Sequence, residues 1–82
     1  QIARDVMIQG GTAGAIFNAA NEEAVSAFLE PGATMPFGRI NELVAEAMAA
    51  IAVTPVHSID DVRSATAVAR DFVQSRLSAT AP

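Results

Sequence analysis

The chain lacks cysteine, lysine, tryptophan and tyrosine altogether, and its 82 residues include a single histidine. The absence of cysteine excludes disulfide bonds, thiolate nucleophiles and zinc–thiolate centres, and it fits the reducing cytoplasm. Five arginines are the only basic residues besides that histidine, and the net charge is −4, so no basic patch is available to neutralise a phosphate backbone. We therefore expect a cytoplasmic protein that does not bind nucleic acid.

Long apolar runs are also missing. No stretch approaches the roughly 18 consecutive apolar residues of a membrane span, and no basic and apolar leader opens the chain, so we expect a soluble chain without a membrane partner. A hydrophobic content of 51% is too high for a disordered segment, and the many alanines favour closely packed helices. At this length we expect one small domain over residues 1–82, which buries about 60% of its unfolded surface.

Helical periodicity is interrupted at Gly10-Gly11, at Pro31-Gly32 and before Ser58. The sequence predicts helices over residues 2–9, 12–30 and 36–51, a fourth helix from Ser58, and a frayed tail at 78–82. No segment shows the alternation of a strand. The expected fold class is therefore all-α, a small helical bundle of three long helices plus a short first helix.

Local signals refine these helices. Thr12 and Ser58 are predicted caps, because a short hydroxyl side chain accepts a bond from the first free backbone N–H groups. Asp60 and Asp61 lie in the first turn of the fourth helix, where the helix dipole favours carboxylates. Helical spacing predicts the core-facing residues of the third helix as Phe37, Ile40, Val44, Ala47, Met48 and Ile51, and those of the fourth as Ile59, Val62, Thr66, Ala69, Phe72, Val73 and Leu77.

The second predicted helix has two distinct faces. One is apolar and is expected to face the core: Ala13, Ile16, Phe17, Ala20, Ala24, Ala27 and Phe28. On the other, Asn21, Glu22, Val25 and Leu29 lie within about 60° of Asn18 on a helical wheel. Asparagine gains little inside a helix, since its amide competes for backbone groups. We interpret this stripe as a contact with further protein through directed hydrogen bonds, with a solvated face as the alternative.

The residues form no self-contained active site. Gly10–Gly14 lacks the preceding strand of a dinucleotide site and the following lysine of a P-loop. Neighbours on a helix point about 100° apart, so neither acidic pair, 22–23 or 60–61, holds a metal alone. His57 has no cysteine or i+4 histidine beside it. We predict no catalytic, cofactor-binding or metal-binding residue in this chain.

The run Asn18-Ala19-Ala20-Asn21-Glu22 carries a family resemblance. It follows Gly10-Gly11-Thr12-Ala13 and precedes Phe37-Gly38-Arg39-Ile40, Ser58-Ile59-Asp60-Asp61-Val62 and Ala69-Arg70. In order and spacing these stretches resemble the carboxy-terminal helical domain of the 1-deoxy-D-xylulose-5-phosphate reductoisomerases. The connection from Glu30 to Met35 is longer than is usual there, and Gly38 and Arg39 replace a more polar or acidic pair.

The resemblance implies a parent enzyme of the non-mevalonate isoprenoid route. It would convert 1-deoxy-D-xylulose 5-phosphate to 2-C-methyl-D-erythritol 4-phosphate with NADPH and Mg²⁺ or Mn²⁺. The cofactor-binding and catalytic domains would lie before Gln1, so this chain would be inactive alone and would need no cofactor of its own. Its expected partner is the catalytic domain of the same polypeptide, and Asn18, Asn21 and Glu22 are the candidates for that contact or for an internal polar lock.

Two other functions stay open at this point. A free-standing helical interaction module would bind a partner helix through the same stripe on the second helix. An acyl-carrier-like protein is a remote alternative, since Ser58-Ile59 opens a helix in a small acidic domain, although His57 stands where that motif has an aspartate. A homodimer is also possible, because missing domains would leave apolar surface exposed.

Overall fold

The computed structural model describes residues 11–79 of the chain, and three helices joined by two connections occur there. They are α2 (Ala13–Leu29), α3 (Gly38–Ala50) and α4 (Ile59–Ala79), and no strand occurs among these residues. The predicted all-α class is thus confirmed. The predicted short first helix at 2–9 lies outside the described residues. The predicted tail overlaps α4 at positions 78 and 79, and residues 80–82 are again outside the described part.

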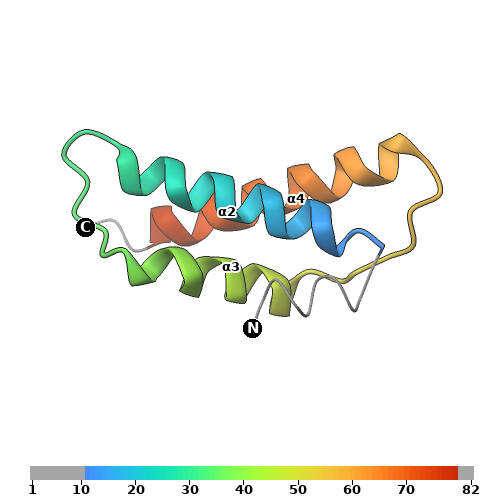
Figure 1. The fold of residues 1–82 in the computed structure, drawn as a ribbon, viewed down its shortest axis with the longest axis horizontal. Coiled ribbons are helices and arrows are strands. Elements are labelled where there is room, and N and C mark those ends of the chain that lie inside the picture. The colour runs from blue at the N-terminus through green and yellow to red at the C-terminus, as the bar shows by residue number, and fades with distance from the viewer. Residues whose placement is uncertain (1–10, 80–82) are drawn as a thin grey trace.

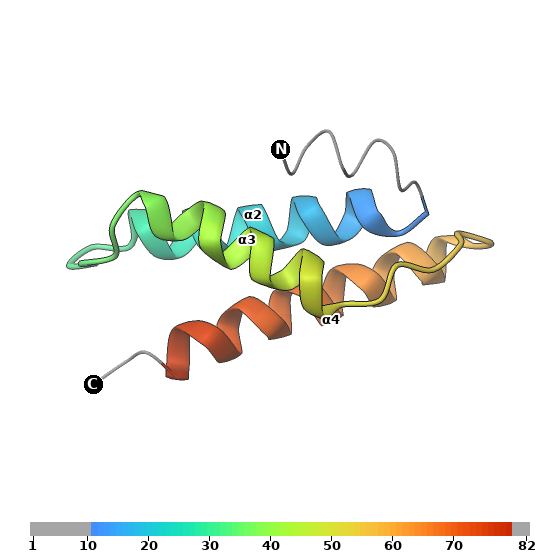
Figure 2. The same cartoon turned by 90° about the horizontal axis from the view of Figure 1, so that it is seen from below.

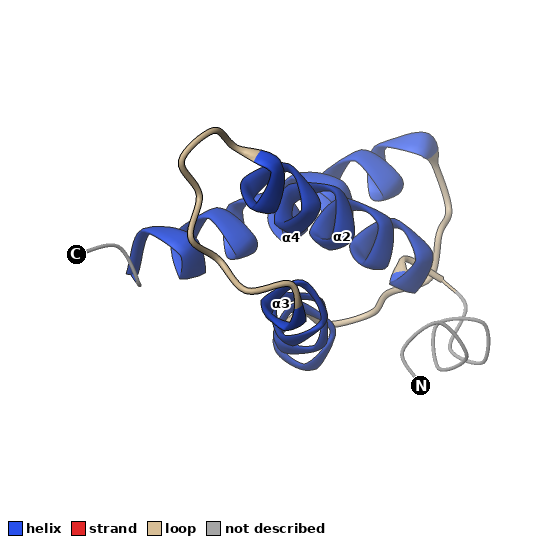
Figure 3. Ribbon diagram, turned by 60° about the vertical axis from the view of Figure 1, so that its left-hand side comes forward, coloured by secondary structure: helices blue, strands red, loops and turns tan. Residues whose placement is uncertain are grey.

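The three helices form a small bundle in which α2 has both of the others as neighbours. Followed along the chain, α2 runs antiparallel to α3 and parallel to α4 (Figure 1). Figure 3 shows α3 nearly end-on, with α2 and α4 beside each other above it. α2 packs against both α3 and α4, whereas α3 and α4 contact each other less, and Figure 2 shows them diverging toward the carboxyl end of α4. α2 is therefore the central element of the packing.

Small side chains let α2 occupy that position. Its buried residues are Ala13, Ile16, Ala19, Ala20 and Ala24, four of them alanines. Ala20 and Ala24 pack with Leu43 and Val44 of α3 and Val73 of α4 in one cluster. A methyl group lets helix backbones approach closely, and larger side chains from the neighbours fill the space. The core face predicted for this helix is largely confirmed, with Ala19 added to it.

The predicted core face of α3 needs one addition and one correction. Leu43, absent from that face, is fully buried, whereas Phe37 is exposed and meets the Phe28 ring edge-on at a centroid distance of 5.7 Å. Phe37 is placed outside because it precedes the helix, which begins two residues later than predicted. The backbone there forms a tight turn, in which Arg39 N–H donates to the Pro36 carbonyl at 3.0 Å.

The predicted core face of α4 is correct only from its second turn onward. Ala69 and Val73 are buried, and Ala65 packs against the smaller core cluster. Ile59 and Val62 are exposed, because the apolar packing of the described residues does not extend to the first turn of α4. Periodicity had correctly identified an apolar face, but part of that face has no neighbouring helix.

Candidate functional site

The outward face of α2 carries the residues that the sequence singled out. Asn18 and Glu22 are exposed and Asn21 is half-buried. Leu29, at the end of the helix, is 70% exposed, whereas Val25 packs at the edge of the core. Since the buried side of α2 faces α3 and α4, the remaining stripe is a genuine surface of this bundle.

No partner for that surface occurs within the described residues. Between positions 11 and 79, the side chains of Asn18, Asn21 and Glu22 make no hydrogen bond or ion pair. An internal polar lock thus gains no support from this part of the chain. The two asparagines, which contribute little to a helix by themselves, are left without a structural role inside the bundle.

Glu23, rather than Glu22, links α2 to another helix. Its Oε2 accepts a hydrogen bond from Gln74 Nε2 at 3.3 Å, and its Oε1 lies 3.7 Å from Arg70 Nε. One residue along a helix turns the side chain by about 100°, and that turn directs Glu23 toward α4 while Glu22 stays outside. Sequence reasoning missed this link, because its partners lie 47 and 51 residues away and no local pattern marks them.

A second charged group joins α3 to α4. Arg39 Nη1 donates to Glu46 Oε2 at 2.7 Å, and the Glu46 Oε1 atom lies 3.8 Å from Arg76 Nε. The Arg76 guanidinium also lies over the Phe72 ring, 4.9 Å from its centroid. The hydrogen bond with Glu46 raises the pKa of Arg39 above its usual value, so this arginine stays charged. Glu46 thus pairs with Arg39 within α3 and with Arg76 across to α4, and these side chains serve the fold.

Thr12 ties the start of α2 to the connector between α3 and α4. Its N–H donates to the Thr54 carbonyl at 2.9 Å, and its Oγ1 accepts from the Thr54 N–H at 3.0 Å. Thr12 is the N-cap residue of α2, as predicted, but its hydroxyl makes no bond to the helix, so the expected side-chain cap is absent. Gly11 lies against the same Thr54 carbonyl and has a backbone φ of +58°. A Cβ at this position would lie 2.5 Å from the Thr54 oxygen. Only glycine fits this position without strain.

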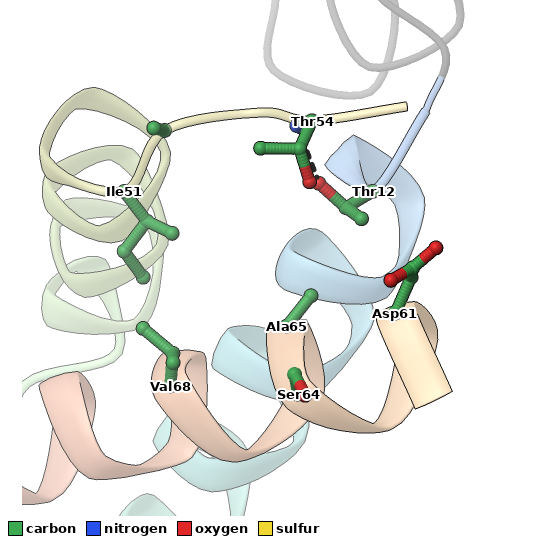
Figure 4. Close-up of a pocket in the computed structure, with 8 residues that line it drawn as sticks. Thr12, Ile51, Thr54, Asp61, Ser64, Ala65 and Val68 are labelled. Atoms are coloured by element: carbon green, nitrogen blue, oxygen red, sulfur yellow. Dashed lines mark hydrogen bonds between the residues drawn. The ribbon is translucent and has the colours of Figure 1, made fainter. Parts of the chain in front are cut away.

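An open hollow of about 330 Å³ lies beside this tie (Figure 4). Ile51, Ala65 and Val68 form apolar walls, and Asp61 is the one ionisable residue that lines it. The Asp61 carboxylate is already engaged, because its Oδ2 accepts the N–H groups of His57 and Ser58 at 2.7 and 3.0 Å. The hollow therefore offers no free acid or base for chemistry.

Between positions 11 and 79, no three His, Cys, Asp or Glu side chains lie close enough together to hold a metal ion. The same stretch contains no helix of the length and apolarity needed to cross a membrane. The described residues thus offer packed helices, interhelical ion pairs and an outer face on α2 that none of them covers.

Comparison with known proteins assigns that arrangement to a family. Residues 1–72 match the model of the DXP reductoisomerase C-terminal domain. The chain belongs to this family. The match favours neither the free-standing module nor the acyl-carrier alternative. It also agrees with the helical fold of the described residues.

Curated relatives agree with the family match. The 1-deoxy-D-xylulose 5-phosphate reductoisomerase of Dechloromonas aromatica is 49% identical over 73 residues, covering 85% of this chain and 17% of that protein. The reductoisomerase of Nitrosospira multiformis is 36% identical over 81 residues, covering 99% of this chain and 20% of the relative. The chain thus spans 17–20% of the length of these relatives. No solved structure gives a significant match.

The motif at 18–22 can now be interpreted for this member of the DXP reductoisomerase C-terminal domain family. Ala19 and Ala20 are buried where α2 meets its neighbours, so packing within the bundle explains them. Asn18 and Glu22 are exposed on the opposite side. The motif combines a core element with a surface element, and only the core element is explained by the domain itself.

Proposed function

We propose that the chain is the C-terminal structural domain of an NADPH-dependent 1-deoxy-D-xylulose 5-phosphate reductoisomerase and supports the catalytic domain of the same polypeptide. The single observation that carries this proposal is the family match over residues 1–72. The short share of each relative that the chain covers is consistent with one domain of a longer enzyme. The parent would form 2-C-methyl-D-erythritol 4-phosphate in non-mevalonate isoprenoid biosynthesis, in the cytoplasm.

The residues described here do not fit the cofactors of that reaction. Gly11, in the glycine-containing turn before α2, lies against the Thr54 carbonyl. This glycine therefore serves packing and does not bind a phosphate group. Asp61 caps α4 with its carboxylate, and no cluster of three metal-ligating side chains occurs between positions 11 and 79. NADPH and Mg²⁺ or Mn²⁺ therefore belong, in this proposal, to the upstream domains, and the 82-residue chain is inactive alone.

The outer stripe of α2 supplies the contact with the catalytic domain in this proposal. Asn18, Asn21 and Glu22 present amide and carboxylate groups that have no partner among the described residues. At an interface, such groups fix the register of two surfaces through directed hydrogen bonds. This role explains why α2 contains two asparagines, although its buried face packs against α3 and α4 without their help.

The test begins with the coding DNA immediately upstream of the Gln1 codon, which should continue as an open frame. The parent polypeptide encoded there should oxidise NADPH when given 1-deoxy-D-xylulose 5-phosphate and Mg²⁺ or Mn²⁺, and EDTA should abolish that turnover. The 82-residue chain should show none under the same conditions. A start codon directly before Gln1, an inactive parent, or turnover by the short chain would contradict the proposal.

A further inference from the structure

The connection between α2 and α3 is held differently from the connector that leads into α4. In that connector, Thr54 exchanges two hydrogen bonds with Thr12 at the start of α2, at 2.9 and 3.0 Å. The connection between α2 and α3 loops out at the opposite end of the bundle (Figure 1). Its positions 31–35 make one hydrogen bond to other described residues, a local one from the Ala33 N–H to the Glu30 carbonyl at 3.0 Å. Hydrogen bonds therefore do not attach these positions to the three helices.

A single side chain attaches this connection to the core. From position 29 to position 38 every residue is exposed except Met35, which is partly buried and packs against the core cluster that contains Leu43. The Phe37 ring meets the Phe28 ring at its edge but stays 73% exposed. A methionine side chain is long and unbranched, so it fills an irregular gap at the edge of a core. The connection thus depends on one thioether for its burial.

The thioether of methionine is open to one well-defined reaction. Its sulfur attacks one oxygen of a hydroperoxide such as hydrogen peroxide, an S–O bond forms, and the O–O bond breaks. The sulfur loses a pair of electrons, and the leaving oxygen takes the proton of the transferred oxygen and departs as water. The resulting sulfoxide is polar and disrupts an apolar contact. Oxidation thus turns an apolar anchor into a group that favours water.

We propose that Met35 is an oxidation-sensitive anchor: transfer of an oxygen atom from a hydroperoxide to its sulfur releases the connection between α2 and α3 from the core and leaves the three helices packed. The helices stay together because the residues that join them, among them Ala24, Leu43 and Val73, are fully buried and lie within the helices themselves. Methionine sulfoxide reductases restore the thioether, so the release is reversible.

A second methionine serves as an internal control for the oxidation. Met48 of α3 is also partly buried, but it packs against both core clusters. The intact polypeptide that contains residues 1–82 is treated with limiting hydrogen peroxide, and mass spectrometry of its peptides locates the added oxygen. Met35 should be oxidised before Met48, because susceptibility follows exposure. In urea the two should react equally fast. Equal or faster oxidation of Met48 in the native protein would overturn the proposal.

Chymotrypsin cleavage after Phe37 measures the release of the connection. Oxidation should speed this cleavage by about tenfold, because cleavage follows the population of the released segment. Far-ultraviolet circular dichroism should stay unchanged, since the helices remain packed. Oxidation without faster cleavage, or with loss of the helical signal, would contradict a local release.

Three substitutions assign the effect to one sulfur. Met35→Leu keeps an apolar side chain without an oxidisable atom, so peroxide should leave its cleavage rate unchanged. Met48→Leu should keep the full response to peroxide. Met35→Gln carries a polar group from the start and should be cleaved rapidly without peroxide. A Met35→Leu protein that responds to peroxide as the unsubstituted protein does, or a Met35→Gln protein that is cleaved no faster, would exclude Met35 as the anchor.

Discussion

The residue composition of the inner face of α2 is explained by contacts within the domain, and that of the outer face is not. On the inner face, Ala20 and Ala24 meet Leu43 of α3 and Val73 of α4, and every one of these residues is fully buried. On the outer face, Asn18 and Glu22 are exposed and are bonded to nothing among the described residues. Both faces carry specific residue types, yet only one of them has neighbours that explain its composition.

In our proposal, the composition of the outer face is set by a contact with protein outside this domain. The inner face is required for the bundle to pack, so its substitution should affect the chain wherever the chain is studied. The outer face should matter only when the upstream domains are present. The first prediction below tests that division directly, and the next ones measure contacts within the bundle, in order of decreasing expected effect.

Replacing one large apolar residue on each face gives the clearest contrast. Ile16→Ala should lower the free energy of unfolding of the 82-residue chain by about 2–5 kcal/mol, because it leaves a cavity in the core. Leu29→Ala, on the exposed side, should change it by less than about 0.5 kcal/mol. Urea unfolding followed by far-ultraviolet circular dichroism measures both. Equal losses from the two substitutions would show that the outer face is packed within the chain after all.

The contact that fixes the start of α2 is tested by two glycines with positive φ. Gly32→Ala should cost about 1–2 kcal/mol from its backbone conformation alone, since nothing lies near its added Cβ. Gly11→Ala should cost a further ~1–3 kcal/mol, because the Cβ would collide with the Thr54 carbonyl. Thermal and urea unfolding of both variants gives the difference. Equal destabilisation would mean that the connector moves freely away from α2.

The hydroxyl of Thr12 gives a smaller effect. Thr12→Val keeps the shape of the side chain but removes the acceptor of the Thr54 N–H, and it should cost about 1–3 kcal/mol. Thr54→Val is the matched control. Thr54 takes part in the contact through its backbone and its side chain is exposed, so this change should stay within about 0.5 kcal/mol. Reversed sizes would contradict the assigned hydrogen bonds.

The ion pairs of Glu46, with Arg39 of the same helix and with Arg76 of α4, should contribute least. Glu46→Gln weakens the pairing with Arg39 and Arg76, and because these side chains are partly exposed the loss should be under about 1 kcal/mol. Glu42→Gln removes a longer and more exposed contact with Arg39 and should cost less still. A double-mutant cycle with Arg39→Gln at low and high salt measures the coupling. A coupling that is absent at low salt would exclude a stabilising role for the pair.

The sequence predicted the helices well because their signals are local. The bounds predicted for α2, residues 12–30, differ by only one residue at each end from Ala13–Leu29. The agreement is close because glycines before the helix and the Pro31-Gly32 pair after it mark where helical spacing stops. The apolar inner face followed from the 3.6-residue period of the helix. The carboxylates of the first turn of α4 were also predicted correctly, and Asp61 is the residue that accepts the backbone N–H groups there.

The long-range contacts could not be predicted in the same way. Thr12 is paired with Thr54, 42 residues away, and Glu23 with Gln74, 51 residues away, and neither pair leaves a periodic signal. Helical spacing placed Ile59 in the core, but a period identifies an apolar face without showing what covers it. The outer stripe of α2 was recognised as unusual for its composition, and its partner remains a proposal.

The most direct test of the account compares Asn21→Leu in the 82-residue chain and in the parent enzyme, with Ser26→Leu as the exposed control on the same helix. In the chain alone, both substitutions should change the free energy of unfolding by less than about 0.5 kcal/mol. In the parent, Asn21→Leu should lower thermal stability and turnover, and Ser26→Leu should leave both unchanged. An Asn21→Leu parent as stable and as active as the unsubstituted enzyme would contradict the claim that this face of α2 contacts the catalytic domain.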